Sequence, residues 1–184
     1  RGFGDGIWDI LGYYDPVKYE IVICDSLVEK HANALAKNKG FDEKTTKLVL
    51  RELVRLHEHG HSLLHTGKVG PLLRFKNGYK SIPPTINESV TEFIVWSTVK
   101  KFGTKLFEAV FDEVDKTTPP YYRYWKRIKQ VIDRKKGRGA YLCYCPGIIY
   151  IVRKEAWKDF ESFLGEIEQE WETVVTIAVS EQMK

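Results

Sequence analysis

A single stretch, from Leu48 to Gly67, limits what this chain can fold into more than any other part of it. Its apolar residues recur at intervals of three and four positions, and they are Leu48, Leu50, Leu53, Val54, Leu56, Leu63 and Leu64. This period matches one face of an α-helix, and Thr45 or Thr46 can cap its first turn. The stretch therefore predicts an amphipathic helix with one buried face.

The same stretch contains the pattern H-E-x-x-H, formed by His57, Glu58 and His61. Histidines four positions apart lie one above the other on a helix, about 6 Å apart along its axis, so both imidazoles can bind one tetrahedral metal ion. Glu58 is turned by about 100° from His57. It can take a proton from a metal-activated water without binding the ion itself. The alternative is a helix whose histidines only pack in the core or face solvent.

Composition limits the class of protein. With 184 residues and 43% apolar residues, the chain can form one compact domain over residues 1–184. The net charge of +4 is too small to indicate a nucleic-acid partner, and no apolar run is long enough to span a membrane. The three cysteines, Cys24, Cys143 and Cys145, are too few for a disulfide framework and favour a reducing, cytoplasmic compartment.

Periodicity and turn residues also predict the elements on either side of this helix. Before it, we expect a strand at residues 18–24, where β-branched residues alternate, and a helix from residue 25 to about 38. After it, residues 87–102 return to a helical period.

The second half of the chain is predicted to be mainly helical. Helices are expected at residues 104–114 and 121–136, and a last amphipathic helix at 155–183 that can be interrupted at Gly165. A Pro-Gly pair between two apolar runs predicts a β-hairpin over residues 140–153. Two of the cysteines would then share one face of a strand and be buried as small apolar groups.

A catalytic metal site needs a third protein ligand. His65 lies eight residues after His57, about 12 Å further along the helix, so it cannot join the other two histidines at one ion. The longer metzincin pattern requires a glycine and a histidine at the positions that Leu64 and Gly67 occupy, which excludes that class. A carboxylate from another helix is the candidate that is left.

The helix predicted at residues 87–102 supplies such carboxylates. Glu88 lies 27 residues after His61, and Glu92 follows four positions later on the same helical face. One of the two can bind the metal while the other supports a ligand histidine. The spacing alone does not assign these two roles.

The order of H-E-H-G-H, a loop and N-E-x-x-x-E resembles the gluzincin zinc metallopeptidases, especially the small soluble minigluzincins and ImmA/IrrE-type proteases. The resemblance covers residues 18–102. It implies one zinc ion held by His57, His61 and Glu88, with Glu58 as the general base and Glu92 as the acidic partner of a ligand histidine.

The same resemblance implies an α+β fold. Residues 1–103 would form a zincin-like catalytic core with a small sheet, an edge strand, the motif helix and the glutamate helix. Residues 104–184 would form a helical subdomain that contains the hairpin at 140–153. Some small members of the family are latent because a terminal segment blocks the cleft, and the hairpin or the last helix could do so here.

The expected function is therefore zinc-dependent hydrolysis of a peptide or protein substrate, which would pair with the strand at residues 18–24. The alternative is a catalytically idle metal-binding or nucleic-acid-binding module with the same fold. Glu58 favours catalysis, because a purely structural zinc site does not need it and more often closes with a fourth protein ligand.

Two further features of the second half bear on function. A developing oxyanion needs a hydrogen-bond donor, and among Tyr121, Tyr122 and Tyr124 we select Tyr122 by position, the alternative being a packed aromatic residue. The helix expected at 121–136 is rich in lysine and arginine. It could bind nucleic acid, although we expect a solvated surface instead.

Overall fold

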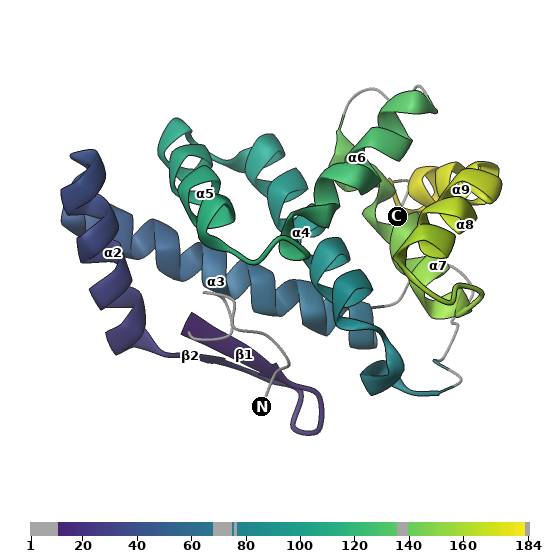
Figure 1. Ribbon diagram of the computed structural model, residues 1–184, viewed down its shortest axis with the longest axis horizontal. Helices are drawn as coiled ribbons and strands as arrows, with labels where there is room; N and C mark the ends of the chain where they lie inside the picture. Colours follow the sequence, from purple (N-terminus) through teal and green to yellow (C-terminus); the bar gives the residue numbers. More distant parts are fainter. Residues whose placement is uncertain (1–10, 68–74, 76, 136–139, 183–184) are drawn as a thin grey trace.

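The computed structural model describes residues 11–67, 75, 77–135 and 140–182, and these are mostly helical (Figure 1). The elements are β1 (Gly12–Asp15), β2 (Glu20–Ile23), α2 (Asp25–Lys39), α3 (Glu43–Thr66), η1 (Tyr79–Ser81), α4 (Pro84–Phe102), α5 (Lys105–Thr117), η2 (Tyr122–Tyr124), α6 (Trp125–Arg134), η3 (Tyr141–Tyr144), α7 (Cys145–Lys154), α8 (Phe160–Gln169) and α9 (Trp171–Gln182). The two strands form one antiparallel sheet. The α+β class expected from the sequence is confirmed at this level.

The sheet is a hairpin that lies along α3. Strand β1 pairs antiparallel with β2, with Gly12 opposite Ile23. A Cβ atom at Gly12 would lie 2.7 Å from Cγ1 of Val54, so the glycine allows β1 to touch α3. Strand β2 confirms the strand predicted at residues 18–24 but starts later, because Tyr19 adopts a left-handed turn conformation with φ 60°. Strand β1 was not predicted.

Helix α3 is the axis of the molecule, with the hairpin on one side and α4 and α5 on the other (Figure 1). It confirms the predicted helix and extends it by a turn at its start. The capping residue is Asp42, whose side chain accepts a hydrogen bond from the amide of Thr45 at 2.8 Å. The expected caps, Thr45 and Thr46, therefore lie inside the helix.

Helix α4 crosses α3 at close range. A Cβ atom at Gly60 would lie 2.9 Å from Cγ2 of Thr91, so the glycine brings the two helices together. The helix begins at Pro84, earlier than the predicted residue 87, because the first turn accepts a proline without losing a hydrogen bond. Residues 89–97 are all buried. Their polar side chains are consequently removed from water.

The β-hairpin predicted at residues 140–153 is wrong. Residues 141–144 form the short helix η3, and Cys145–Lys154 form helix α7. Pro146 lies in the first turn of α7, where backbone N–H groups have no helical acceptor, so its missing N–H costs no hydrogen bond. The Pro-Gly pair therefore begins a helix rather than a β-turn. Gly147 packs on α9, where an added Cβ would lie 2.6 Å from the carbonyl oxygen of Val174.

The last predicted helix, at residues 155–183, is divided in two. Asp159 caps α8 by accepting a hydrogen bond from the amide of Ser162 at 2.8 Å, so α8 starts five residues later than expected. The break before α9 falls at Glu170, whereas Gly165 lies inside α8.

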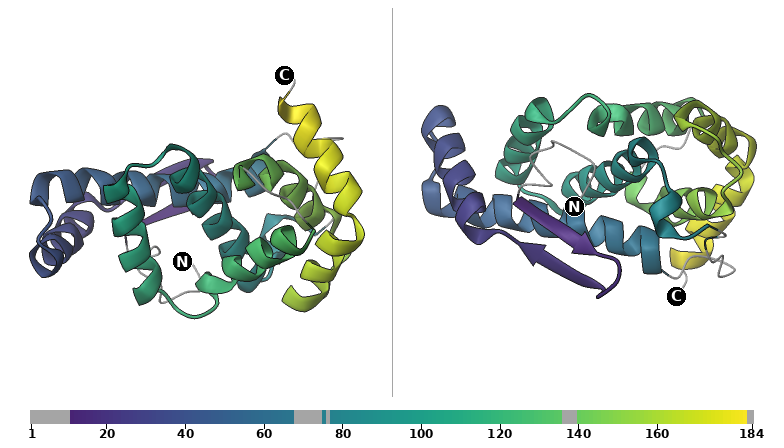
Figure 2. Two further views of the ribbon diagram at one scale, coloured as in Figure 1. Left: turned by 90° about the horizontal axis from the view of Figure 1, so that it is seen from above. Right: turned by 60° about the horizontal axis from the view of Figure 1, so that its bottom comes forward.

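The C-terminal helices share their core with the motif helices. Figure 2 shows α7, α8 and α9 gathered at the end of the molecule opposite α2. Buried apolar side chains from Leu11 to Ile177 form one cluster, in which the ring of Tyr141 packs on Trp96 of α4 with centroids 4.8 Å apart. Removing the chain after residue 136 would thus remove core residues.

A buried arginine joins the two halves. The guanidinium of Arg153, on α7, donates hydrogen bonds to the carbonyl oxygens of Leu63 and Leu64 at 3.0 to 3.1 Å. These carbonyls belong to the last turn of α3, where that of Leu63 also accepts a hydrogen bond from the amide of Gly67 at 2.8 Å. Helix α7 therefore completes the C-terminal end of the motif helix. In the part of the chain that the structure describes, every helix is too short or too polar to cross a membrane.

Candidate metal centre

Three side chains from α3 and α4 converge on one point. Nε2 of His57 lies 3.1 Å from Nε2 of His61, and Oε2 of Glu88 lies 3.3 Å from the first and 3.4 Å from the second. Both histidines are buried. The structure therefore brings together the three residues expected to bind metal, from two helices.

These separations fit a metal ion. Tetrahedral ligands about 2.0 to 2.2 Å from zinc are about 3.3 to 3.6 Å from one another, close to the three distances observed. Among the described residues, no further histidine, cysteine, aspartate or glutamate joins this group. Three protein ligands and a fourth position for water or substrate are the arrangement of catalytic zinc sites.

The hydrogen-bond partners of the imidazoles also fit a cation. Nδ1 of His57 faces Oε1 of Glu92 at 3.3 Å, and Nδ1 of His61 faces Oδ1 of Asn87 at 3.2 Å. Both oxygens are acceptors, so in each neutral ring the proton lies on Nδ1. The two Nε2 lone pairs then face each other and the Glu88 carboxylate, an arrangement that a positive ion between them stabilises.

The pKa values of His57 and Glu88 also reflect the close contact between the histidines and the carboxylates. Burial lowers the pKa of His57, but the carboxylates of Glu88 and Glu92 outweigh it and raise this pKa well above its ordinary value. Burial raises the pKa of Glu88, but the two histidines outweigh it and lower this pKa to about 2.

Glu58 directly follows His57 and is not one of the three side chains that could hold a metal ion. Its side chain is buried, and an added Cβ at Gly12 would lie 3.4 Å from its Cγ. Strand β1 therefore passes beside the residue expected to act as general base.

Glu92 is buried against His57, and burial raises its pKa. The structure places it where the resemblance expected an acidic partner of a ligand histidine. For the other ligand, His61, the partners are residues that the sequence analysis did not select: Asn87, Tyr79 and Thr91 each place an oxygen 3.2 Å from its Nδ1. Asn87 could have been selected, because it directly precedes Glu88.

Tyr122 also lies at this centre. Its side chain is 1% exposed, and its ring stacks near that of His57 with centroids 6.1 Å apart. The hydroxyl of Ser89 donates a hydrogen bond to the carbonyl oxygen of Tyr121 at 3.1 Å, which ties η2 to α4. Tyr124, by contrast, packs on Phe160 of α8.

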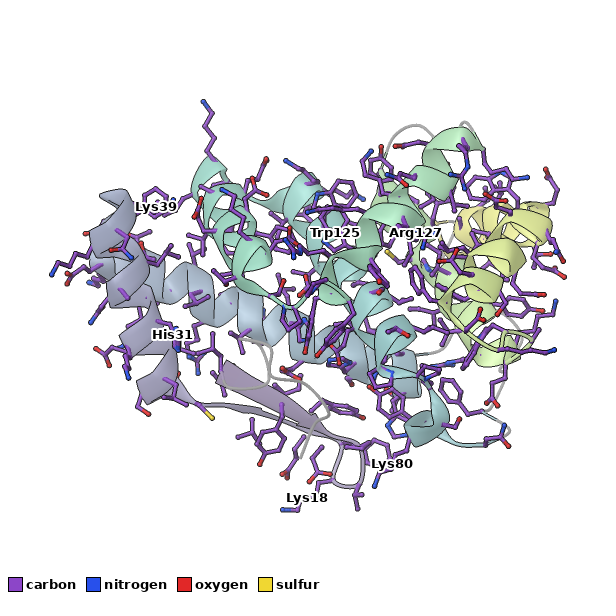
Figure 3. All side chains as sticks on the ribbon, viewed as in Figure 1. Lys18, His31, Lys39, Lys80, Trp125 and Arg127 are labelled. Atoms are coloured by element: carbon purple, nitrogen blue, oxygen red, sulfur yellow. The ribbon has the colours of Figure 1, made fainter. Side chains whose placement is uncertain are left out.

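The basic residues of α6 are paired with acids. Arg127 and Arg134 form ion pairs with Glu161 and Glu168 of α8, and Lys126 pairs with Asp115 at 2.7 Å. Figure 3 labels Trp125 and Arg127 on α6, and the side chain of Arg127 is 42% exposed. This pairing neutralises much of the charge that a nucleic acid would need.

The cysteines do not lie on a strand as expected, because the predicted hairpin is absent. Cys145 is buried at the start of α7, and burial raises the pKa of its thiol to about 12. Cys143 is half-buried in η3. Buried packing, expected for both, is found for Cys145.

Comparison with protein-family models, with curated proteins and with solved structures gives no significant match to this chain. Its function is therefore inferred from its own residues and their geometry.

Proposed function

We propose that this chain is a zinc-dependent peptidase of the gluzincin type, in which β1, β2, α3 and α4 form a zincin-like core. The observation that carries the proposal is the convergence of His57, His61 and Glu88, with Glu58 beside them. Two imidazoles and one carboxylate with an open fourth position are a ligand set that favours zinc.

When bound, zinc supplies Lewis acidity, which polarises the scissile carbonyl and makes water more acidic. The chain supplies the proton transfers. Glu58 takes a proton from the attacking water and then gives it to the nitrogen of the leaving amine.

Other side chains orient the reacting groups. Glu92 and Asn87 hold the imidazoles of His57 and His61 with their Nε2 atoms directed to the ion. Tyr122 is the candidate donor to the developing oxyanion, because its ring lies next to His57. In the described residues β1 and β2 pair only with each other, so a substrate peptide can add to this sheet as a further strand.

Two measurements test the proposal. Metal analysis of the purified chain should give about one zinc per chain. Cleavage of a broad peptide library should then fall by at least about 100-fold in Glu58→Gln, which cannot take a proton, while the zinc content stays unchanged. Glu52→Gln, a substitution on the partly exposed face of the same helix, is the matched control and should cleave as the wild type does.

A wild-type chain that binds zinc but cleaves no peptide would contradict the proposed peptidase activity. The alternative of a catalytically idle metal-binding module would then be favoured. Equal activities of the wild type and Glu58→Gln would remove Glu58 from the mechanism.

A further inference from the structure

The last of the four histidines of α3, His65, is not part of the metal group, and its surroundings are aromatic. Its Nδ1 lies 3.0 Å from the hydroxyl of Tyr14. Its ring stacks on Tyr19 with centroids 5.3 Å apart at 5°, and on Tyr79 with centroids 4.8 Å apart at 30°. His65 therefore links the hairpin to the short helix η1.

Tyr79 contacts both His65 and the candidate metal centre. Its hydroxyl lies 3.2 Å from Nδ1 of His61, 3.2 Å from Nδ2 of Asn87 and 3.3 Å from Oδ1 of Asn87. One hydroxyl thus touches both a metal ligand and the amide that orients this ligand.

The hydrogen-bond roles follow from the chemistry of these groups. A tyrosine hydroxyl can accept a bond from Nδ1–H of His61 while it donates its own proton to Oδ1 of Asn87. Both bonds favour the form of His61 with its proton on Nδ1. In that form the lone pair of Nε2 is directed toward Glu88 and the metal position.

The ring of Tyr79 has to be held for its hydroxyl to act in this way. Helix η1 is only three residues long, so the backbone alone fixes the side chain weakly. The stack on His65 and the edge contacts with Tyr14 and Phe75, at centroid distances of 6.3 and 6.2 Å, fix the ring instead.

We propose that Tyr79 is a positioning residue for the metal ligand His61 and that His65 acts through Tyr79 by holding its ring. The inference rests on the metal centre of the proposed function. It gives a role to a histidine of the same helix that geometry excludes from the ion.

Zinc affinity and the absorption spectrum of the Co²⁺-substituted chain test this role. Replacing a partner of a ligand histidine changes metal affinity by about 10- to 100-fold. Because Asn87 and Thr91 stay near His61, we expect Tyr79→Phe to weaken zinc binding by about 10-fold and to shift the Co²⁺ bands. Tyr13→Phe removes the hydroxyl of an exposed tyrosine on the same strand as Tyr14, and its zinc affinity should stay within about twofold of the wild type.

Two variants separate the stacking of His65 from its nitrogen chemistry. His65→Ala removes the stacked ring and should weaken zinc binding, whereas His65→Phe keeps a ring and should restore it. Circular dichroism and thermal unfolding of the metal-free chains report on the fold. A merely structural role would move the unfolding temperature and leave the Co²⁺ spectrum of Tyr79→Phe unchanged.

Wild-type affinity and spectrum in Tyr79→Phe would overturn this inference alone, as would zinc binding by His65→Phe that is as weak as that of His65→Ala. A wild-type chain that binds no metal would overturn the proposed function and the inference together. Zinc binding that Tyr79→Phe weakens, in a chain that cleaves no peptide, would support the positioning role while contradicting the peptidase.

Discussion

Basic and acidic side chains meet across two helix pairs, α3–α4 and α6–α8, with different consequences. Between α3 and α4, His57 and Glu92 are 1% and 2% exposed. Between α6 and α8, the side chains of Arg127 and Glu161 are 42% and 67% exposed. Burial, rather than the presence of a pair, distinguishes the candidate metal centre from a surface contact.

The difference follows from how closely the helices approach. Gly60 lets α4 lie against α3, and the polar groups at this crossing have to satisfy one another because water is excluded. The pairs between α6 and α8 stay hydrated and screened by salt, so each contributes little. Substitutions on the two sides should therefore differ in size and in kind.

The largest effect is expected from a ligand on α3. His61→Ala removes one of the three proposed ligand atoms, so zinc affinity should fall by more than the upper value of about 100-fold found for outer partners. Zinc content after dialysis measures this loss. His59→Ala changes an exposed histidine of the same helix and should retain zinc; equal losses in both variants would contradict the assignment.

A smaller effect is expected from the buried acid behind His57. Glu92→Gln keeps the shape of the side chain but removes its charge, so zinc affinity should fall by about 10- to 100-fold. Competition with a chelator measures this affinity. Glu161→Gln is the surface counterpart and should leave zinc affinity unchanged. If Glu161→Gln weakens zinc binding as much as Glu92→Gln does, the contrast between the two regions is wrong.

The metal-free chain should show a pH effect that belongs to Glu88. Its pKa is lowered from 4.5 to about 2 in the folded chain, so its contribution to stability is present above pH 4.5 and is lost as the pH falls toward 2. At pH 5.5 in a chelator, Glu88→Gln should lower the free energy of unfolding by up to about 3 kcal/mol.

This difference between wild type and Glu88→Gln should shrink as the pH is lowered, because a protonated glutamate resembles glutamine. Urea unfolding between pH 5.5 and 3 measures it. Parallel pH curves for the two chains would show that Glu88 has no unusual pKa.

The smallest effect is expected on the surface. Arg127→Ala removes the exposed pair with Glu161 and should lower the unfolding temperature by less than about 3 °C. The shift should decrease further in 1 M salt, because salt screens exposed charges. A larger, salt-independent shift in thermal unfolding would mean that the α6–α8 contact is as important as the buried one.

Local patterns of the sequence were sufficient for α3. Its apolar period and the four-residue spacing of His57 and His61 describe one helix, and neither depends on a distant residue. The same kind of pattern was misleading at residues 140–153, because an apolar run with Pro146 is compatible with a buried helix as well as with a hairpin. Packing of Gly147 on α9 decides between them.

By itself, the sequence therefore determined that two histidines and one glutamate share a helix, and its spacing brought Glu88 and Glu92 into consideration. Only the tertiary structure decided that Tyr79, Thr91 and Tyr122 also lie at this centre. The physical reason is range: helical periodicity acts over a few residues, whereas these contacts depend on how α4, η1 and η2 pack against α3.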